Sequence, residues 1–233
     1  MVQKIETLQK PHLIFCEGMD EKWFLIRFLN SAALSGNPFF SSEIQVVNFG
    51  GNEELTQKLE VLRLSPGFSE VRSLLIVRDA EQDGEAAVRE IRHSLQRAEL
   101  PVPYGPGQWA LGGPRVGFLL FPTCDRTVAR GTLEDLCLSL LEPTDRETML
   151  EEIDAFLGHL QGGYQRSFPH LHKARLHTYF SITDRFVGMK IGEAAAAMAF
   201  DWKDPRLHFF RDFLLEAAAG GEPVDRQDGN DRA

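Results

Sequence analysis

Four short apolar runs recur within the first 121 residues of the chain, each bounded by turn-forming residues. They cover residues 12–16, 44–49, 73–77 and 116–121. Each run is apolar at nearly every position, whereas a strand with one face in water alternates apolar and polar residues. The pattern therefore predicts four strands of a mainly parallel sheet that is covered by helices on both faces.

Helical patterns separate these runs. Residues 21–34 and residues 85–98 each place their apolar side chains on one stripe, and residues 52–62 form a weaker third candidate. Parallel strands need a crossover connection, which is usually a helix, so this alternation predicts an α/β fold with right-handed connections.

The strand signal fades after residue 132, and only helical patterns follow. The candidate helices cover residues 132–141, 146–160, 173–180, 185–200 and 205–219. We expect an α/β domain over residues 10–142 and a C-terminal helical extension over 143–219 that packs on it. Residues 220–233 have too few apolar side chains to join a core, and we expect them to be a disordered tail.

Composition narrows the class of protein further. The 233 residues are 43% hydrophobic and 25% charged, which is typical of a soluble globular protein. The net charge of −9 excludes a strongly basic nucleic-acid-binding coat, although a local basic groove stays compatible with it. No apolar run approaches the roughly 20 residues that span a bilayer, and the N-terminus lacks the apolar core of a signal peptide. We expect a cytoplasmic protein without a membrane partner.

Acidic residues follow the predicted strands. Glu17 comes directly after the first run, and Asp79, Glu81 and Asp83 follow the third. Glu134 follows the fourth run after a loop that covers residues 122–131. The carboxyl ends of parallel strands meet at one edge of a sheet, where ligands bind. Carboxylates held together repel one another unless a cation neutralises them, and oxygen ligands favour Mg²⁺ or Mn²⁺ over zinc. The sequence therefore predicts a Mg²⁺ (or Mn²⁺) site at this edge.

This order of acids resembles the Toprim fold of topoisomerases, bacterial primases and nucleases of the overcoming-lysogenization-defect type. The resemblance lies in Glu17-Gly18 after a strand, Asp79-Ala80-Glu81 after another, and a compact four-stranded sheet. The chain is most similar to a bacterial Toprim-like family of unknown function with the pattern Glu-Gly, Asp-Ala-Asp, Gly-x-Leu-Glu and a Lys-rich helical tail. The match spans about residues 10–142, and residues 173–216 extend it. It implies a three-layer fold.

The resemblance also implies roles for the acids. Glu17 would act as a general acid or base and help to position metal, while Asp79 and Glu81 would bind a divalent ion. Glu81 replaces the family's second Asp, and its extra methylene weakens the transfer of a tight Mg²⁺ geometry, so Asp83 is an alternative ligand. Glu134 would serve a second metal ion.

The implied activity is Mg²⁺-dependent, nuclease-type cleavage of phosphodiester bonds, with nucleic acid or a nucleotide as partner. Lys173 is the candidate for neutralising charge on the reacting phosphate. Two other functions stay open. One is a catalytically silent Toprim-shaped module that binds a nucleotide or a protein partner. The other is a single-metal α/β phosphatase or phosphotransferase, for which the sequence has no nucleophile motif.

Several candidate residues also have simpler structural explanations. Glu17 could face solvent in a turn made by Gly18, and Asp83 suits the N-cap of the following helix. Thr132 and Asp135 form a capping pattern that leaves Glu134 without a capping role.

Four further features of the sequence also allow more than one explanation or carry a weak signal. Gly50-Gly51 could approach a phosphate or simply shape a tight turn, and the Gly-rich segment 104–114 is interpreted as a long mobile loop over one end of the sheet. His170 and His172 lack a third zinc ligand at the usual spacing. The basic residues of the helical extension suit either a solvated helix face or a phosphate-contacting surface; they are Arg166, Lys173, Arg175, Arg185 and Lys190.

Overall fold

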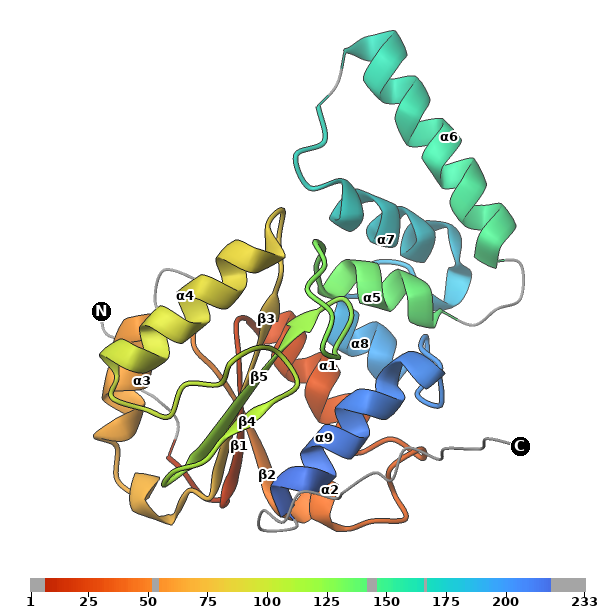
Figure 1. Ribbon diagram of the computed structural model, residues 1–233. Helices are drawn as coiled ribbons and strands as arrows, with labels where there is room; N and C mark the ends of the chain where they lie inside the picture. Colours follow the sequence, from red (N-terminus) through yellow and green to blue (C-terminus); the bar gives the residue numbers. More distant parts are fainter. Residues whose placement is uncertain (1–6, 52–54, 142–145, 166, 219–233) are drawn as a thin grey trace, which may run out of the picture.

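The computed structural model describes residues 7–51, 55–141, 146–165 and 167–218. Its centre is a five-stranded sheet in the order β2-β1-β3-β5-β4 (Figure 1). The strands are β1 (His12–Cys16), β2 (Ile44–Asn48), β3 (Ser73–Asp79), β4 (Trp109–Ala110) and β5 (Arg115–Phe121). All neighbours pair in parallel except β4, which runs antiparallel to β5. The α/β class is confirmed, but the sheet has five strands rather than the predicted four.

The additional strand lies in the Gly-rich segment 104–114, for which the sequence pattern predicts a mobile loop. Trp109 pairs with Gly117 and Ala110 with Val116. A two-residue strand has no apolar run, so the sequence pattern could not reveal it. A side chain at Gly117 would come within 2.9 Å of Trp109 and 3.0 Å of Phe213, and the rings of Trp109 and Phe213 stack 4.5 Å apart. This stacking holds β4 at the edge of the sheet.

Helices cover both faces of the sheet (Figure 1). Helices α3 (Leu55–Arg63) and α4 (Gly84–Arg97) pack on one face. Helices α1 (Met19–Leu29), α5 (Leu133–Leu140), α8 (Ile191–Ala196) and α9 (His208–Ala218) contribute to the core of the other. Successive residues of a strand point to opposite faces, so Leu13 and Phe15 join one core whereas Ile14 joins the other. This division explains why the strand sequences are apolar throughout.

Two predicted helices differ from their sequence patterns, one by ending early and one by being divided. Helix α1 stops at Leu29, before a turn and the short helix α2 (Phe39–Ser42), although the apolar stripe extends to residue 34. The predicted helix 185–200 is divided into a 3₁₀ turn, η3 (Asp184–Phe186), and α8, because Gly188 between them has φ +74°. Two further 3₁₀ turns are η2 (Phe68–Glu70) and η4 (Pro205–Leu207).

The helical extension joins the same core as one face of the sheet. Its long helix α6 (Arg146–Tyr164) packs against α7 (Leu171–Ile182), which contacts α5 (Figure 1). Helices α8 and α9 contribute buried side chains to the core cluster that also holds residues of β1 and β5. The predicted tail 220–233 lies outside the described residues. No helix within the described ranges is long and apolar enough to cross a membrane.

Candidate active site

The two central strands of the sheet place Glu17 and Asp79 at the same edge. β1 and β3 are parallel neighbours with Cys16 paired to Val77, so Glu17 directly follows β1 while Asp79 ends β3. The chain leaves these strands in opposite directions, with α1 on one face and α4 on the other. Such a switch point opens a crevice beyond the carboxyl ends of the strands.

Asp79 is a buried carboxylate at the end of β3. One oxygen, Oδ1, accepts a hydrogen bond of 2.8 Å from the backbone amide of Leu133 at the start of α5. Burial raises the pKa of Asp79 well above its ordinary value, and the neighbouring charges of Glu21, Glu17 and Glu134 raise it further, against the opposing effect of the Leu133 amide. Asp79 therefore lies within electrostatic reach of three other acids.

Glu17 has a side chain that is only 17% exposed. Its Oε2 atom is buried, and within the described residues it makes no hydrogen bond. The nearest cation is Arg78, whose Nε lies 3.9 Å from this oxygen while its Nη1 donates to Glu90 at 2.9 Å. Burial raises the pKa of Glu17 to about 7; Arg78 opposes this shift, and Glu21 and Glu81 add to it. Glu17 can therefore change protonation near neutral pH.

Glu134 and Lys173 come together from α5 and α7. Glu134 is buried, and its Oε1 lies 3.5 Å from the Nζ of Lys173, a side chain that is 55% exposed. Partial burial lowers the pKa of Lys173, but the charge and hydrogen bond of Glu134 outweigh burial and raise it overall, with smaller contributions from Asp79 and Glu21. The helical extension thus brings a stable positive charge to the acidic edge.

Glu21 is a member of the site that the sequence analysis missed. It lies in the first turn of α1, four residues after Glu17. Burial raises its pKa, and Asp20 and Glu134 raise it further, whereas Lys173 lowers it. A side chain at Gly18 would lie 2.5 Å from Glu21 Oε2, so this glycine leaves space for the Glu21 carboxylate. The i, i+4 spacing from Glu17 is the sequence signal that could have identified Glu21. Acids in the first turn of a helix are common, however, because the helix dipole stabilises them.

We call these four acids, Glu17, Glu21, Asp79 and Glu134, the carboxylate cluster. Among the described residues, no group of three His, Cys, Asp or Glu side chains is close enough together to coordinate a metal ion as the structure stands. The donor chemistry nevertheless suits Mg²⁺ or Mn²⁺, because all four donors are carboxylates and Glu17 Oε2 is buried without a hydrogen bond in the described chain. The side chains would have to draw together to coordinate an ion.

The other two predicted metal ligands lie in the connection that follows β3. Glu81 is exposed and has φ +55°, and its backbone pairs with that of Gly131. Its charge still contributes to the raised pKa of Glu17. Asp83 is the N-cap of α4, accepting from the Ala86 amide at 3.0 Å, and its side chain is 62% exposed. The structure therefore brings Glu81 near the cluster and gives Asp83 a capping role.

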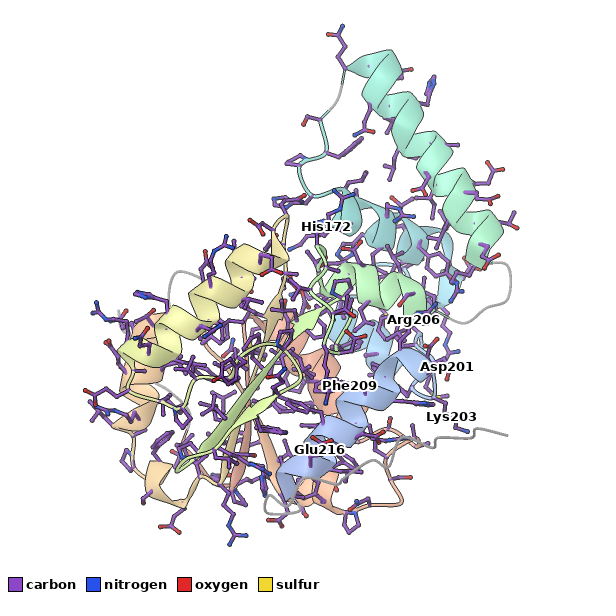
Figure 2. The ribbon with its side chains drawn as sticks, viewed as in Figure 1. His172, Asp201, Lys203, Arg206, Phe209 and Glu216 are labelled. Carbon is purple, nitrogen blue, oxygen red and sulfur yellow. The ribbon has the colours of Figure 1, made fainter. Side chains whose placement is uncertain are left out.

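The other segments with open alternatives have the following surroundings. Gly50 and Gly51 both have positive φ, and the Gly50 amide donates to the Glu17 carbonyl at 2.9 Å, which continues the pairing of β2 with β1 beyond the ends of the strands. The rings of His170 and His172 lie 6.0 Å apart near the start of α7, where Figure 2 labels His172. Thr132 and Asp135 form the predicted capping box, which leaves Glu134 free for the cluster.

The described basic residues of the extension have different neighbours. Arg175 is paired with Asp154 through two hydrogen bonds, of 2.6 and 2.9 Å, and Arg185 lies over the ring of Phe186. Lys173 pairs with Glu134, as described above, and Arg166 lies outside the described residues. Lys190 instead lines a pocket beside α1.

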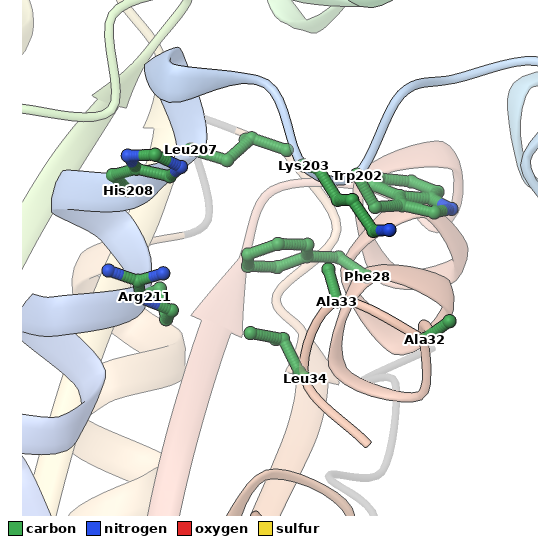
Figure 3. Close-up of a pocket in the computed structure, with 9 residues that line it drawn as sticks. All are labelled: Phe28, Ala32, Ala33, Leu34, Trp202, Lys203, Leu207, His208 and Arg211. Carbon is green, nitrogen blue, oxygen red and sulfur yellow. The ribbon is translucent and has the colours of Figure 1, made fainter. Parts of the chain in front are cut away.

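Several pockets lie along α1. One has a volume of about 850 Å³ and is lined by α1 side chains from Met19 to Arg27 and by side chains of α7 and α8. The pocket at its C-terminal end, about 250 Å³, lies between Phe28, Trp202 and Arg211 and is shown in Figure 3. The first adjoins the carboxylate cluster, because Asp20 in its wall is one of the charges that raise the pKa of Glu21.

Comparison with curated proteins and with solved structures finds no match. A family model described as "Protein of unknown function (DUF3226)" matches residues 11–218. The matched region contains the whole carboxylate cluster, Lys173 and the helices that surround them. The chain therefore belongs to the DUF3226 family.

Proposed function

We propose that this protein is a Toprim-like, Mg²⁺- or Mn²⁺-dependent enzyme that hydrolyses phosphodiester bonds of nucleic acid. The observation that carries the proposal is the convergence of four partly or fully buried carboxylates at the switch point of the sheet. Buried acids that raise one another's pKa are unfavourable for folding, and such arrangements concentrate at functional sites. A bound divalent cation would relieve that repulsion.

Each residue has a role that follows from its position. Asp79, Glu134 and Glu21 would hold the ion, with Glu17 at the edge of the set and Glu81 as a further candidate. Divalent ions in such sites stabilise the charge of the phosphate and of the leaving oxygen. Glu17 can accept or donate a proton near neutral pH because its pKa is about 7. The ammonium group of Lys173 adds positive charge for the phosphate at the same edge.

Metal-dependent cleavage tests the proposal directly. Labelled single-stranded and duplex DNA and RNA are incubated with the protein in Mg²⁺, in Mn²⁺ and in EDTA. We expect cleavage only with metal, and its loss in Glu17→Gln and Asp79→Asn. The matched control is Asp83→Asn, which removes an exposed carboxylate and retains an N-capping side chain. Equal activity in all four proteins would reject the assignment.

The second candidate is a catalytically silent module of the same shape that binds a nucleotide or a protein partner. It is favoured by the absence of a ready ligand set in the described chain and by Glu81 in place of aspartate. Nucleotide binding without turnover under any divalent metal would support this function over hydrolysis.

A further inference from the structure

A pocket beside the carboxylate cluster has no role in the chemistry described so far. We call it the Trp23 pocket; its volume is about 850 Å³. It is lined by Met19, Asp20, Trp23, Arg27, His177, Lys190, Gly192, Glu193 and Ala196. This volume is in the range of small-molecule sites, which are usually apolar clefts with a few polar groups.

The pocket and the carboxylate cluster share two helices. On α1, Asp20 lines the pocket while the adjacent Glu21 belongs to the cluster. On α7, His177 lines the pocket one turn after Lys173, and residues four apart lie on the same face of a helix. A ligand that extends out of the Trp23 pocket along these helices would reach the acids.

Trp23 is an aromatic side chain that is exposed at its ring and fixed at its base. It is 44% exposed, although it lies within a helix whose other large apolar side chains are mostly buried. Its Cβ packs directly on Gly192 of α8, where an added side chain would overlap it. Because α8 holds the base of the side chain, the ring is a rigid platform, and such a platform loses little entropy when a flat ligand stacks on it.

The polar groups of the pocket match the other parts of a nucleotide. The ion pairs of the described chain include neither Arg27 nor Lys190, so both cations are available to a phosphate. Glu193 accepts from the Lys190 backbone amide at 2.8 Å, and Asp20 supplies a second carboxylate. Carboxylates accept hydrogen bonds from the exocyclic amines of bases, as they do in base recognition.

We infer that the Trp23 pocket binds an unpaired nucleotide of a single-stranded nucleic acid, with the base stacked on Trp23. The inference rests on the proposed function, because it places this nucleotide next to the phosphodiester at the carboxylate cluster. Stacking on an aromatic side chain requires a base that is free of its partner, so the favoured substrate is single-stranded. Arg27 and Lys190 would contact the phosphates that flank the stacked base.

Binding and cleavage are measured separately. Binding is followed by fluorescence anisotropy of an end-labelled single-stranded oligonucleotide, with Ca²⁺ in place of Mg²⁺ to suppress turnover. We expect Trp23→Leu to raise Kd by about fivefold or more, the loss associated with one base stack. Trp23→Phe keeps an aromatic face and should restore most of the affinity. The control Tyr104→Leu removes an aromatic side chain that is 85% exposed and lies outside the pocket.

Several outcomes would overturn the inference. The first is that Trp23→Leu binds the oligonucleotide as tightly as the wild type. The second is that Tyr104→Leu weakens binding as much as Trp23→Leu does. The third is that Trp23→Phe binds as weakly as Trp23→Leu although its melting temperature equals that of the wild type. Equal affinity for the matching duplex, or for a free mononucleotide, would overturn the assignment to a single strand.

If no protein cleaves but Trp23→Leu still weakens binding, the stacking site stands and hydrolysis fails. If Glu17→Gln abolishes cleavage while Trp23→Leu binds normally, only the pocket inference fails.

Discussion

The carboxylate of Asp79 accepts a 2.8 Å hydrogen bond from the backbone amide of Leu133, which links the end of β3 to the first turn of α5. The two residues are 54 positions apart in the chain. Because Glu134 directly follows Leu133, this bond also places a second buried acid beside Asp79. Asp79, a proposed metal ligand, thus also has a structural role, and substitutions at this position can separate the two.

Replacing Asp79 by asparagine and by alanine should have different effects on stability. Asp79→Asn keeps an oxygen that can accept from Leu133 and removes a buried charge, so we expect a free energy of unfolding at least equal to that of the wild type. Asp79→Ala leaves the Leu133 amide without a partner and should lower it by about 1–3 kcal/mol. Urea denaturation measures both. Equal stability of the two variants would show that this hydrogen bond does not hold α5.

The pH dependence of stability follows from Glu17. Folding raises its pKa from 4.5 to about 7, so between these values the folded protein binds more protons than the unfolded chain. The free energy of unfolding therefore falls as the pH rises through this window, and the raised pKa values of Glu21 and Asp79 act in the same direction. Glu17→Gln removes one contribution and should flatten the decline.

Thermal unfolding in EDTA across this pH window is the measurement. The control is Glu85→Gln, which removes an exposed acid in the first turn of α4. We expect it to keep the wild-type slope. A slope in Glu17→Gln as steep as that of the wild type would mean that the Glu17 carboxylate is not held in a desolvated environment.

The sequence pattern predicted the centre of the fold because buried parallel strands are apolar on both faces. The run 12–16 coincides with β1, and the other runs match their strands to within two residues. The position of Glu17 and Asp79 at one edge follows from topology alone, since the carboxyl ends of parallel strands must meet.

The features that the pattern missed depend on contacts between distant segments. β4 is held by the stacking of Trp109 on Phe213, and neither residue marks a strand by itself. Arg78 is a charged residue, and its sequence position does not predict burial. It is nevertheless buried beside Glu17, because β1 and β3 both end there. Glu21 has the sequence of an ordinary first-turn acid, and only the fold places it beside Asp79 and Glu134.

Glu21 should contribute to metal binding as strongly as the acids that the sequence identified. Titration calorimetry with Mn²⁺ should show weaker binding in Glu21→Gln and Glu134→Gln, and wild-type binding in Asp83→Asn, whose carboxylate is a helix cap. Bound metal should also raise the melting temperature, because a ligand at 100 times its Kd stabilises the folded state by about 2.7 kcal/mol. If Asp83→Asn lost metal binding while Glu21→Gln kept it, the metal ligands would instead be the acids that follow β3 in the sequence, Asp79, Glu81 and Asp83.

Lys173 should affect catalysis far more than stability. Its ammonium lies 3.5 Å from Glu134, but the side chain is 55% exposed, so we expect Lys173→Met to change the free energy of unfolding by about 1 kcal/mol or less. If this charge stabilises the reacting phosphate, the same variant should lower kcat by about 100-fold, as the loss of one electrostatic contact to a transition state does. Lys173→Arg keeps the charge and should retain part of the rate. The control Lys203→Met removes an exposed lysine that lines the pocket of Figure 3, and this variant should cleave like the wild type. If Lys173→Met had a normal kcat, Lys173 would have no role in catalysis and would only pair with Glu134.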